Sequence, residues 1–504
     1  MARGDGMGRK ARAASAMWYR LYETLDADAG SPRARVQNLL VQAVVERFLA
    51  PGDALPSGRT LARRLGVARS TVTAALRRLM DLGYVESRER SGYYVHPRVQ
   101  RHFADGGAVP KEGTPSQDAF WEQRFRMDLS GQRNIAKPPD WQDYRYPFLY
   151  GQFDARLFPR HEWRDCVRAS LSLAGIKAWA PDLIDRDEPS LIRQLQTQLL
   201  PARGVWVGTD EILVTAGAQN ALFLLAMLLV EDGRVVGVED PGYPDARNIF
   251  EMHGGSVRPI PMDDHGIVVG EAIRECDYLF VTPSHQCPTG VTLPIDRRER
   301  LIELANAHGV VIIEDDHESE LNFASHPTPA LKSLDQTHNV VYIGSLSKTL
   351  AHGMRLGYVA GPAALIRELR KVRRLCLRHP ANNNEFTAAQ FIRNGYHEAY
   401  VNYLNGIYRE RSQALEAAIR RHLPAWRFRQ REGGSALWVQ GPANMHGDEV
   451  AAAARQQGVL VEPGHVFFSD DRAPRNYLRM GYSSISAEDI DEGIRRLAEV
   501  PGVH

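Results

Sequence analysis

Five short apolar segments constrain the fold of this chain more than any other feature of the sequence. They read EILVTAG (211–217), RVVGVED (234–240), YLFVTPS (278–284), VVIIEDD (310–316) and VVYIGSLS (340–347). Each ends in small or acidic residues, and stretches with helical periodicity separate most of them. This alternation predicts an α/β architecture, with a mainly parallel sheet that carries helices on both faces.

The composition is that of a soluble globular protein. The chain has 504 residues, of which 43% are hydrophobic and 24% charged, and this excludes a collagen-like, wholly disordered or membrane-embedded protein. The longest apolar run, 221–230, is about half a membrane span.

The first residues are basic without an apolar core, so we expect no secretory signal. Four scattered cysteines without a CxxC pair predict no disulfide framework, no metal site and a cytoplasmic location.

The charge is divided unevenly along the chain. Residues 1–101 hold 18 Lys and Arg against 9 Asp and Glu, a net charge of +9, so the remainder carries −8 within a total of +1. A basic N-terminal module on a mildly acidic body suggests a domain that binds a polyanion.

The basic region contains a pattern of two helices followed by a hairpin. In LPSGRTLARRLGVARSTVTAALRRLMDLGYVESRERSGYYV, Ser57 is a candidate N-cap and Gly66 a turn. A second helix begins near Ala68 and ends before Gly83. The last twelve residues predict two short strands around Ser91 and Gly92. This order is that of a winged helix-turn-helix; the alternative is a helical hairpin with an exposed charged face.

The second helix would read DNA bases with residues at its start, namely Arg69, Ser70, Thr71 and Thr73. Four further arginines of the two helices would neutralise phosphates: Arg63, Arg64, Arg77 and Arg78. The stretch LPSGRTLARRLGVARSTV also resembles the DNA-binding domain of the GntR regulator family, with Ala68 where serine is usual. That resemblance implies that Arg59, Arg69 and Thr71 contact DNA and that Gly92 lies in the wing near the minor groove.

We divide the chain into four parts on these patterns. Residues 1–16 are expected to be a disordered basic tail, 17–98 a winged helix-turn-helix domain, 99–125 a polar linker and 126–504 the α/β domain.

In the large domain, two segments carry charged groups that suit an aldehyde cofactor. Lys348 follows an apolar strand in a Ser/Gly-rich loop, and Arg355 offers a planar fork to a phosphate. The strand VVIIEDD ends in carboxylates, of which one would hold a pyridine nitrogen protonated. Taken singly, a loop lysine is usually solvated, and the carboxylates suit a metal site or a strand cap equally well.

Two further segments suit the phosphate and the ring of such a cofactor. A strand passes through Gly217 directly into an apolar helix, whose first N–H groups would seat a phosphate. Tyr243 follows another strand end, where it would stack on a ring. Each motif alone is common in proteins; the four in this order and spacing are specific.

From about Tyr146 to the end, the chain resembles fold-type I pyridoxal-phosphate (PLP) enzymes of the aminotransferase class, including LFPRHEWR, EDPGYPDAR, TPSHQCPTG, EDDHESEL, SLSKTL and LRMGYSS. With the GntR-type module, this is the arrangement of MocR/GabR-like transcriptional regulators. The resemblance implies PLP as the cofactor, a small C-terminal α+β subdomain and a homodimer.

The resemblance also assigns roles. Lys348 forms the Schiff base, Asp315 pairs with the pyridine nitrogen, Tyr243 stacks on the ring and Arg479 takes a ligand carboxylate. The phosphate is held by Gly217, Ala218, Gln219, Ser345, Ser347 and Arg355.

Three departures from the family pattern affect these roles. His317 replaces the tyrosine that donates to the ring hydroxyl, and we expect an imidazole there to make cofactor protonation depend on pH. Cys287 stands where aminotransferases have asparagine and cannot replace its hydrogen bond. The segment that usually supplies a tyrosine to the partner subunit's site reads LIDRDEPS (183–190).

These patterns together predict a PLP-dependent regulator that binds operator DNA and senses an amino acid or related amine by transaldimination at Lys348, with at most partial transamination. Three alternatives stay open: a genuine aminotransferase with a DNA-binding domain, a regulator of vitamin B6 synthesis that senses PLP itself, and a scaffold with a vestigial cofactor site.

Overall fold

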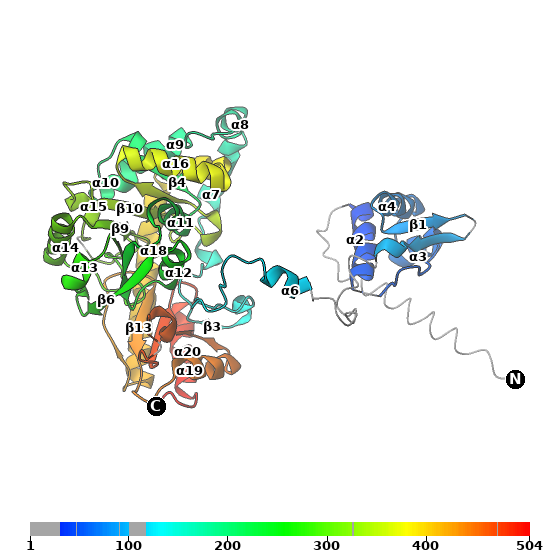
Figure 1. The fold of residues 1–504 in the computed structure, drawn as a ribbon. Helices are drawn as coiled ribbons and strands as arrows, with labels where there is room; N and C mark the ends of the chain where they lie inside the picture. The colour runs from blue at the N-terminus through cyan, green and yellow to red at the C-terminus, as the bar shows by residue number, and fades with distance from the viewer. Residues whose placement is uncertain (1–30, 47, 90, 100–116, 325–326, 471) are drawn as a thin grey trace. The chain divides into compact units, whose positions relative to one another are not determined.

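The computed structural model describes residues 31–46, 48–89, 91–99, 117–324, 327–470 and 472–504. Its contacts divide the chain into two compact units, Met1–Arg126 and Met127–His504 (Figure 1). The predicted tail 1–16 and most of the predicted linker lie outside the described residues. The described end of that linker contains a short helix, α6 (Gln117–Glu122).

The N-terminal unit contains the predicted helices and hairpin. Its elements are α2 (Pro32–Val45), α3 (Gly58–Leu65), α4 (Arg69–Asp81), β1 (Val85–Arg88), β2 (Gly92–Val95) and a 3-10 turn (Pro97–Val99). Ser57 accepts a hydrogen bond from the Thr60 amide at 3.2 Å and caps α3, and Gly66 ends it at φ +64°. The core comes from all three of these helices and the hairpin, including Val36, Leu39, Leu61, Leu65, Val72, Leu76, Leu79, Val85 and Val95.

The C-terminal unit is built on an eight-stranded sheet of order β4-β11-β10-β9-β8-β5-β6-β7. The strands are β4 (Ile212–Thr215), β5 (Val235–Asp240), β6 (Ser256–Asp263), β7 (Gly266–Ile267), β8 (Tyr278–Val281), β9 (Val311–Asp315), β10 (Val340–Ser345) and β11 (Gly357–Ala360). The five predicted apolar segments are β4, β5, β8, β9 and β10. Strands β6, β5, β8, β9 and β10 are parallel, whereas β11 is antiparallel to both β10 and β4, so β4 and β10 run in the same direction.

Helices cover both faces of this sheet, as the sequence predicts. Ile313 of β9 packs on the face covered by α11 (Ala218–Leu229), α12 (Pro244–Met252) and α16 (Ala363–Leu377). The adjacent Ile312 packs on the opposite face, which is covered by α13 (Glu271–Arg274), α14 (Ile295–His308) and α15 (Leu331–Leu334). Strands that are buried on both faces explain the unbroken apolar runs in the sequence.

A smaller sheet lies near the C-terminus. Its four antiparallel strands, in the order β12-β13-β16-β15, are β12 (Arg427–Phe428), β13 (Ala436–Gln440), β16 (Tyr477–Gly481) and β15 (Glu462–Pro463). A two-stranded parallel pair joins β3 (Tyr146–Pro147) to β14 (Val459–Leu460). The helices of this region are α18 (Tyr396–His422), α19 (Gly447–Gln456) and α20 (Ala487–Ala498).

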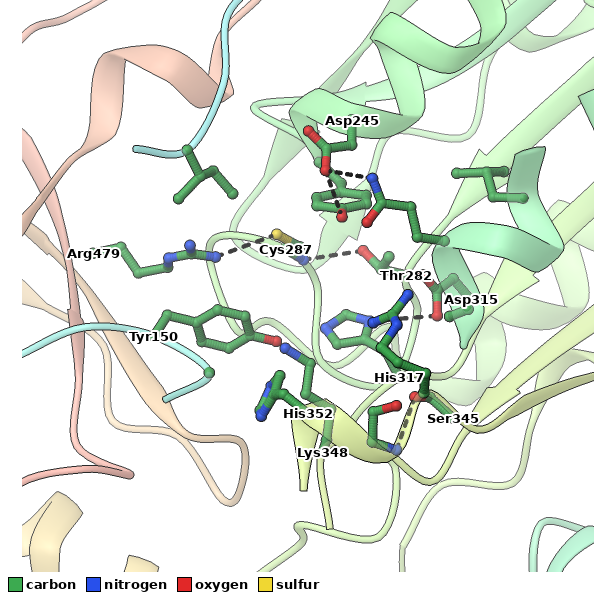
Figure 2. Close-up of a pocket in the computed structure, with 18 of the residues that line it drawn as sticks. Tyr150, Asp245, Thr282, Cys287, Asp315, His317, Ser345, Lys348, His352 and Arg479 are labelled. Carbon is green, nitrogen blue, oxygen red and sulfur yellow. Dashed lines mark hydrogen bonds and ion pairs between the residues drawn. The ribbon is translucent and has the colours of Figure 1, made fainter. Parts of the chain in front are cut away.

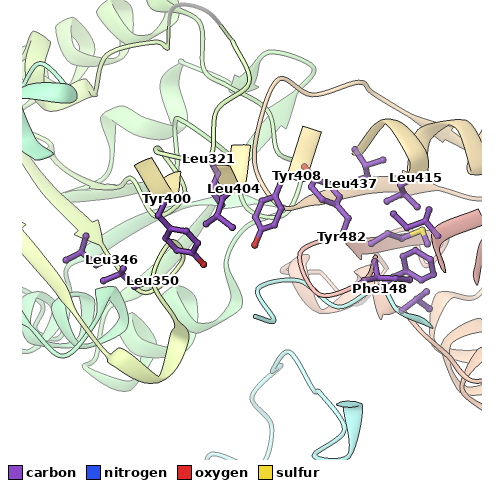
Figure 3. Packing of buried hydrophobic residues seen from close by; sticks show 14 of the residues in the cluster. Phe148, Leu321, Leu346, Leu350, Tyr400, Leu404, Tyr408, Leu415, Leu437 and Tyr482 are labelled. Carbon is purple, nitrogen blue, oxygen red and sulfur yellow. The ribbon is translucent and has the colours of Figure 1, made fainter. Parts of the chain in front are cut away.

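Helix α18 links the two sheets of the C-terminal unit through one hydrophobic cluster. Figure 3 shows Tyr400 and Leu404 beside Leu346 and Leu350, which follow β10, and Leu415 of the same helix among Leu437 and Phe148 of the smaller subdomain. The remaining helices are α7 (Arg160–Ser170), α8 (Leu173–Trp179), α9 (Pro189–Gln194), α10 (Leu200–Ala202) and α17 (Asn382–Arg393), with a π-helical segment Leu195–Leu199 between α9 and α10. Among the described residues, no helix has the length and apolarity needed to cross a membrane.

Candidate functional site

The carboxyl ends of the parallel strands open into a cavity of about 360 Å³. Eleven of the predicted site residues line it: Ala218, Gln219, Tyr243, Cys287, Asp315, His317, Ser345, Ser347, Lys348, Arg355 and Arg479. They come from both sheets of the unit, and ten are separated from Arg479 by more than a hundred residues of sequence. Gly217, the remaining predicted cofactor residue, is the N-cap of α11, next to Ala218 and Gln219.

One end of the cavity is arranged to hold an anion. Arg355 donates from Nη2 to the carbonyl of Ala216 at 3.0 Å, which holds its guanidinium at the start of α11. Gly217 has φ +86°, and a Cβ on it would lie 2.9 Å from Arg355 Nη2, so glycine permits this approach. No side chain caps the first N–H groups of α11. A guanidinium and free helix N–H groups are the donors that phosphate prefers.

The loop between β10 and Lys348 is ordered by its own hydroxyl groups. Ser345 Oγ accepts from the Ser347 amide at 3.3 Å, and Ser347 Oγ donates to the carbonyl of Leu356 at 3.4 Å. These bonds fix the turn that carries the Lys348 side chain into the cavity (Figure 2).

The Lys348 amine is buried in the cavity. Burial lowers its pKa, an effect that Glu318 opposes. Its Nζ lies 4.2 Å from the centroid of the Tyr150 ring. Removing a lysine amine from water in this way favours the neutral form that acts as a nucleophile.

Asp315 presents an unpaired oxygen at the end of β9. Its side chain is buried and Oδ1 has no hydrogen-bond partner. Burial, reinforced by the charge of Asp316, raises the pKa of Asp315 to about 7. Asp316 itself points away into an ion pair with Arg203 at 2.8 Å. A buried, unsatisfied carboxylate oxygen suits a cationic N–H donor.

His317 lies beside Asp315, with Nδ1 3.7 Å from Asp315 Oδ1. Burial lowers the pKa of His317 to about 4. Because burial disfavours the charged form, the imidazole is neutral near pH 7 in this cavity. Its effect on the protonation of a bound cofactor stays a prediction.

Tyr243 and Cys287 also line the cavity. The Tyr243 hydroxyl and the Gln219 amide both donate to Asp245 Oδ2 at 3.0 Å. Burial raises the pKa of Cys287 to about 12, so this side chain is a neutral thiol. Its backbone N–H donates to Thr282 Oγ1 at 3.0 Å.

Arg479 reaches the cavity from β16. Its Nε donates to Glu462 Oε2 at 2.8 Å, Nη1 lies 3.7 Å from the Cys287 sulfur, and Nη2 is buried without a partner. Its guanidinium carbon lies 4.1 Å from the centroid of Tyr150 and 4.5 Å from that of Phe467. The free Nη2 is a donor available to a ligand anion.

Several residues of the cavity were not identified from the sequence. They are Ile135, Lys137, Tyr150, Gly151, Leu222, Asp245, Thr282 and His352. Lys137 donates to the carbonyl of Tyr150 at 2.5 Å, and burial lowers its pKa to about 8. In the sequence, His352 stands between Lys348 and Arg355 in SLSKTLAHGMR, so its position close to two predicted site residues already indicated that it could reach the cavity.

The segment LIDRDEPS has a structural role in this chain. Asp187 is buried and forms ion pairs with Arg370, at 2.6 Å, and with Arg373. Its Oδ1 also accepts from the Val214 amide of β4 at 3.3 Å. Glu188 caps α9 by accepting from the Leu191 amide at 2.9 Å. These acidic residues therefore join α16 and α9 to the sheet.

The residues proposed to contact DNA lie in the N-terminal unit. Arg59, Arg69, Ser70 and Gly92 are exposed, whereas Thr71 and Thr73 are half-buried. Thr73 donates its hydroxyl to the Arg69 carbonyl at 3.0 Å. Ala68 gives α4 no side-chain cap, so backbone N–H groups at the start of this helix stay free for a phosphate.

Comparison with known proteins identifies both units. Residues 32–95 match the family described as bacterial regulatory proteins, gntR family, and residues 190–497 match aminotransferase class I and II. The HTH-type transcriptional regulator TauR of Rhodobacter capsulatus is 36% identical over 469 residues, 93% of this chain and 96% of that protein. The probable rhizopine catabolism regulatory protein MocR of Rhizobium meliloti is 29% identical over 94% of both chains.

Solved structures similar to the C-terminal unit are aminotransferases. The α-aminoadipate aminotransferase LysN of Thermus thermophilus, complexed with N-(5'-phosphopyridoxyl)-L-leucine, matches with a TM-score of 0.68 and 25% identity. The match covers 75% of this chain and 97% of that one. Kynurenine aminotransferase of Pyrococcus horikoshii matches with a TM-score of 0.66 and 27% identity, over 71% and 90% of the two chains.

Proposed function

Because the chain belongs to the MocR and TauR type of transcriptional regulator, in which a GntR helix-turn-helix domain precedes an aminotransferase-like domain, we propose that it is a PLP-dependent regulator whose DNA binding responds to an amino acid or a related amine. The amine exchanges with Lys348 by transaldimination.

The observation that carries this proposal is the unpaired Asp315 Oδ1 in the cavity that also holds the Lys348 amine. Asp315 Oδ1 would accept a hydrogen bond from a protonated pyridine nitrogen. The opposite end of PLP, its phosphate, fits Arg355, Ser345, Ser347 and the first N–H groups of α11, beginning at Gly217. Tyr243, which also lines the cavity, would contribute an aromatic face to the ring. Bound PLP would supply an aldehyde that condenses with a primary amine and a ring that withdraws electrons.

The chemistry around Arg479 suits an effector with a carboxylate. Its buried Nη2 lacks a partner, and Glu462 fixes the guanidinium from the other side. An effector with an amine near Lys348 and a carboxylate on Arg479 would satisfy both groups. His317 and Cys287 would make weaker hydrogen bonds to the ring hydroxyl of the cofactor than a tyrosine and an asparagine make. We therefore propose at most partial transamination.

The N-terminal unit would bind the operator, with an affinity that depends on whether an effector occupies the cavity. Arg69 and Ser70 at the exposed start of α4, with Thr71 and Thr73, would contact base edges, and Arg59 and Gly92 would contact the backbone and the minor groove. Exchange of the amine would favour one of two arrangements of a homodimer on DNA.

A genuine aminotransferase is the second candidate, because Lys348, Asp315 and Arg479 meet in one cavity and the similar solved structures are aminotransferases. It predicts conversion of PLP to its amine form with release of a keto acid. A sensor of PLP itself would instead change its DNA affinity on addition of PLP without any amine.

The test of the cofactor assignment is the visible absorbance of purified protein titrated with PLP. Lys348→Ala should abolish the imine band, and addition of amino acids should shift the band of the parent protein. An unchanged spectrum in Lys348→Ala would remove the assignment of Lys348. Stoichiometric keto acid over repeated turnovers would favour the aminotransferase.

A further inference from the structure

Tyr150, Gly151 and His352 line the part of the cavity around the Lys348 amine, and together they form its pocket. Its Nζ contacts the face of the Tyr150 ring at 4.2 Å from the centroid. Gly151 forms the wall beside it, because a Cβ on this residue would lie 2.8 Å from Lys348 Nζ and 3.3 Å from His352 Nε2. Gly151 has φ +65°, a conformation that glycine adopts without strain.

The pocket offers the groups that an amine or ammonium requires. An aromatic face attracts a cation. Both ring nitrogens of His352 are buried without partners, and burial lowers the pKa of this residue to about 3, so the ring is neutral and keeps one nitrogen as an acceptor. The charged groups that act on Lys348 are Glu318, Arg479 and Asp315, and those that act on His352 are Lys348, Lys137 and Arg355.

We propose that Tyr150, Gly151 and His352 form the site that receives the Lys348 amine after an effector amine has displaced it from the cofactor. This inference rests on the proposed function. In the exchange, the effector nitrogen bonds to the aldehyde carbon of the cofactor and the bond from that carbon to Lys348 Nζ breaks. The protons lost by the incoming ammonium pass to Lys348 Nζ, so that no oxidant or reductant is needed.

Tyr150, Gly151 and His352 would therefore help to set the effector concentration to which the regulator responds. Holding the released amine stabilises the effector-bound state, because Lys348 competes with the effector for the same carbon. Removing the receiving site should therefore raise the effector concentration required for half-exchange without requiring any loss of contact with the effector.

The experiment compares Tyr150→Leu, Tyr150→Phe and His352→Leu with the parent, using the visible absorbance of the PLP-loaded protein titrated with methylamine and, separately, with an α-amino acid. Methylamine has no carboxylate, so its exchange does not depend on Arg479, which Tyr150 also contacts. Tyr144→Leu is the matched control, because Tyr144 contacts Arg455 outside the cavity.

Tyr150→Leu should raise the half-exchange concentration of both amines by about 2- to 30-fold, the range expected for loss of one cation–π contact. Tyr150→Phe keeps the ring face and should lie much closer to the parent. His352→Leu should also raise both values, which keeps the inference testable if Tyr150→Leu does not fold. Parent-like values for Tyr150→Leu and His352→Leu, or a loss confined to the amino acid, would overturn the inference.

A second readout needs no cofactor. In PLP-free protein, the pH dependence of reductive methylation at Lys348, followed by mass spectrometry, should shift to lower pH in Tyr150→Leu because the ring no longer stabilises the ammonium. An unshifted profile would contradict the inference. Failure of Lys348 to form an imine in the parent would instead contradict the proposed function, so the two failures are distinguishable.

Discussion

Arg479 donates a hydrogen bond from Nε to Oε2 of Glu462 across 2.8 Å, and both side chains are buried. The contact fixes the guanidinium and directs Nη2, which has no partner, toward a ligand anion. We expect Arg479→Ala to weaken amino-acid binding by about 10- to 150-fold, the range for a lost charge-assisted hydrogen bond. PLP binding should fall far less. Spectroscopic titrations measure both affinities, and equal losses would mean that Arg479 has a structural role.

Asp315 should make the stability of the PLP-free protein depend on pH. Its folded-state pKa is about 7 against an ordinary 3.8, so the folded protein holds a proton that the unfolded chain releases. Stability therefore falls as the pH rises from about 4 to about 7. Asp315→Asn removes this penalty, and its advantage over the parent at pH 8 should be at most about 4 kcal/mol.

Chemical denaturation at pH 5 and pH 8, with and without PLP, measures this effect. The advantage of Asp315→Asn in PLP-free protein should shrink at pH 5, and saturating PLP should stabilise the parent more than the variant. An equal gain from PLP in both proteins would show that Asp315 is not the partner of the pyridine nitrogen.

Arg69 is the first residue of α4 and Arg77 lies in its C-terminal half, so the two should affect DNA binding differently. Arg69→Ala removes a contact to base edges and should cost about 1–3 kcal/mol, with relaxed specificity at one base pair. Arg77→Ala removes a phosphate contact and should weaken binding to all sequences, reducing the slope of the salt dependence by about 1. Fluorescence anisotropy with operator and substituted operators separates these outcomes; identical effects would place base recognition elsewhere.

Asp187 should contribute to stability and not to cofactor binding. Its buried ion pairs with Arg370 and Arg373 hold α16 on the sheet. Breaking them by Asp187→Asn leaves the guanidinium groups without their carboxylate and should cost about 3–5 kcal/mol of unfolding free energy. Asp185→Asn is the matched control, because this side chain is 86% exposed and lies 3.9 Å from Arg374. A lost PLP absorbance band without lower stability would contradict this assignment.

The sequence predicted those parts of the fold that local patterns encode. The N-cap at Ser57, the turn at Gly66 and the five apolar strands follow from capping geometry and burial on both faces. Strand β11 was not predicted, because Gly357–Ala360 is short and its position between β4 and β10 depends on long-range pairing.

The residues of the cavity also fall into two groups: those that local motifs predict and those that only the tertiary structure brings together. Lys348, Asp315 and Tyr243 follow strands and were found from motifs. Tyr150 and Lys137 precede the first strand of the large sheet, and no local pattern shows that this segment returns to the cavity. The pairing of β3 with β14 holds the chain there, and only the tertiary structure reveals it.

The measurement that tests the central claim most directly is binding of the purified full-length chain to the DNA upstream of its own gene, compared with scrambled DNA at physiological salt. It is made without ligand, with PLP, and with PLP plus an amino acid that shifts the absorbance band. The account predicts selective binding whose affinity changes when the amino acid is added to PLP-loaded protein, and no such change in Lys348→Ala. Equal binding to both DNAs, or a response to the amino acid that persists in Lys348→Ala, would contradict it.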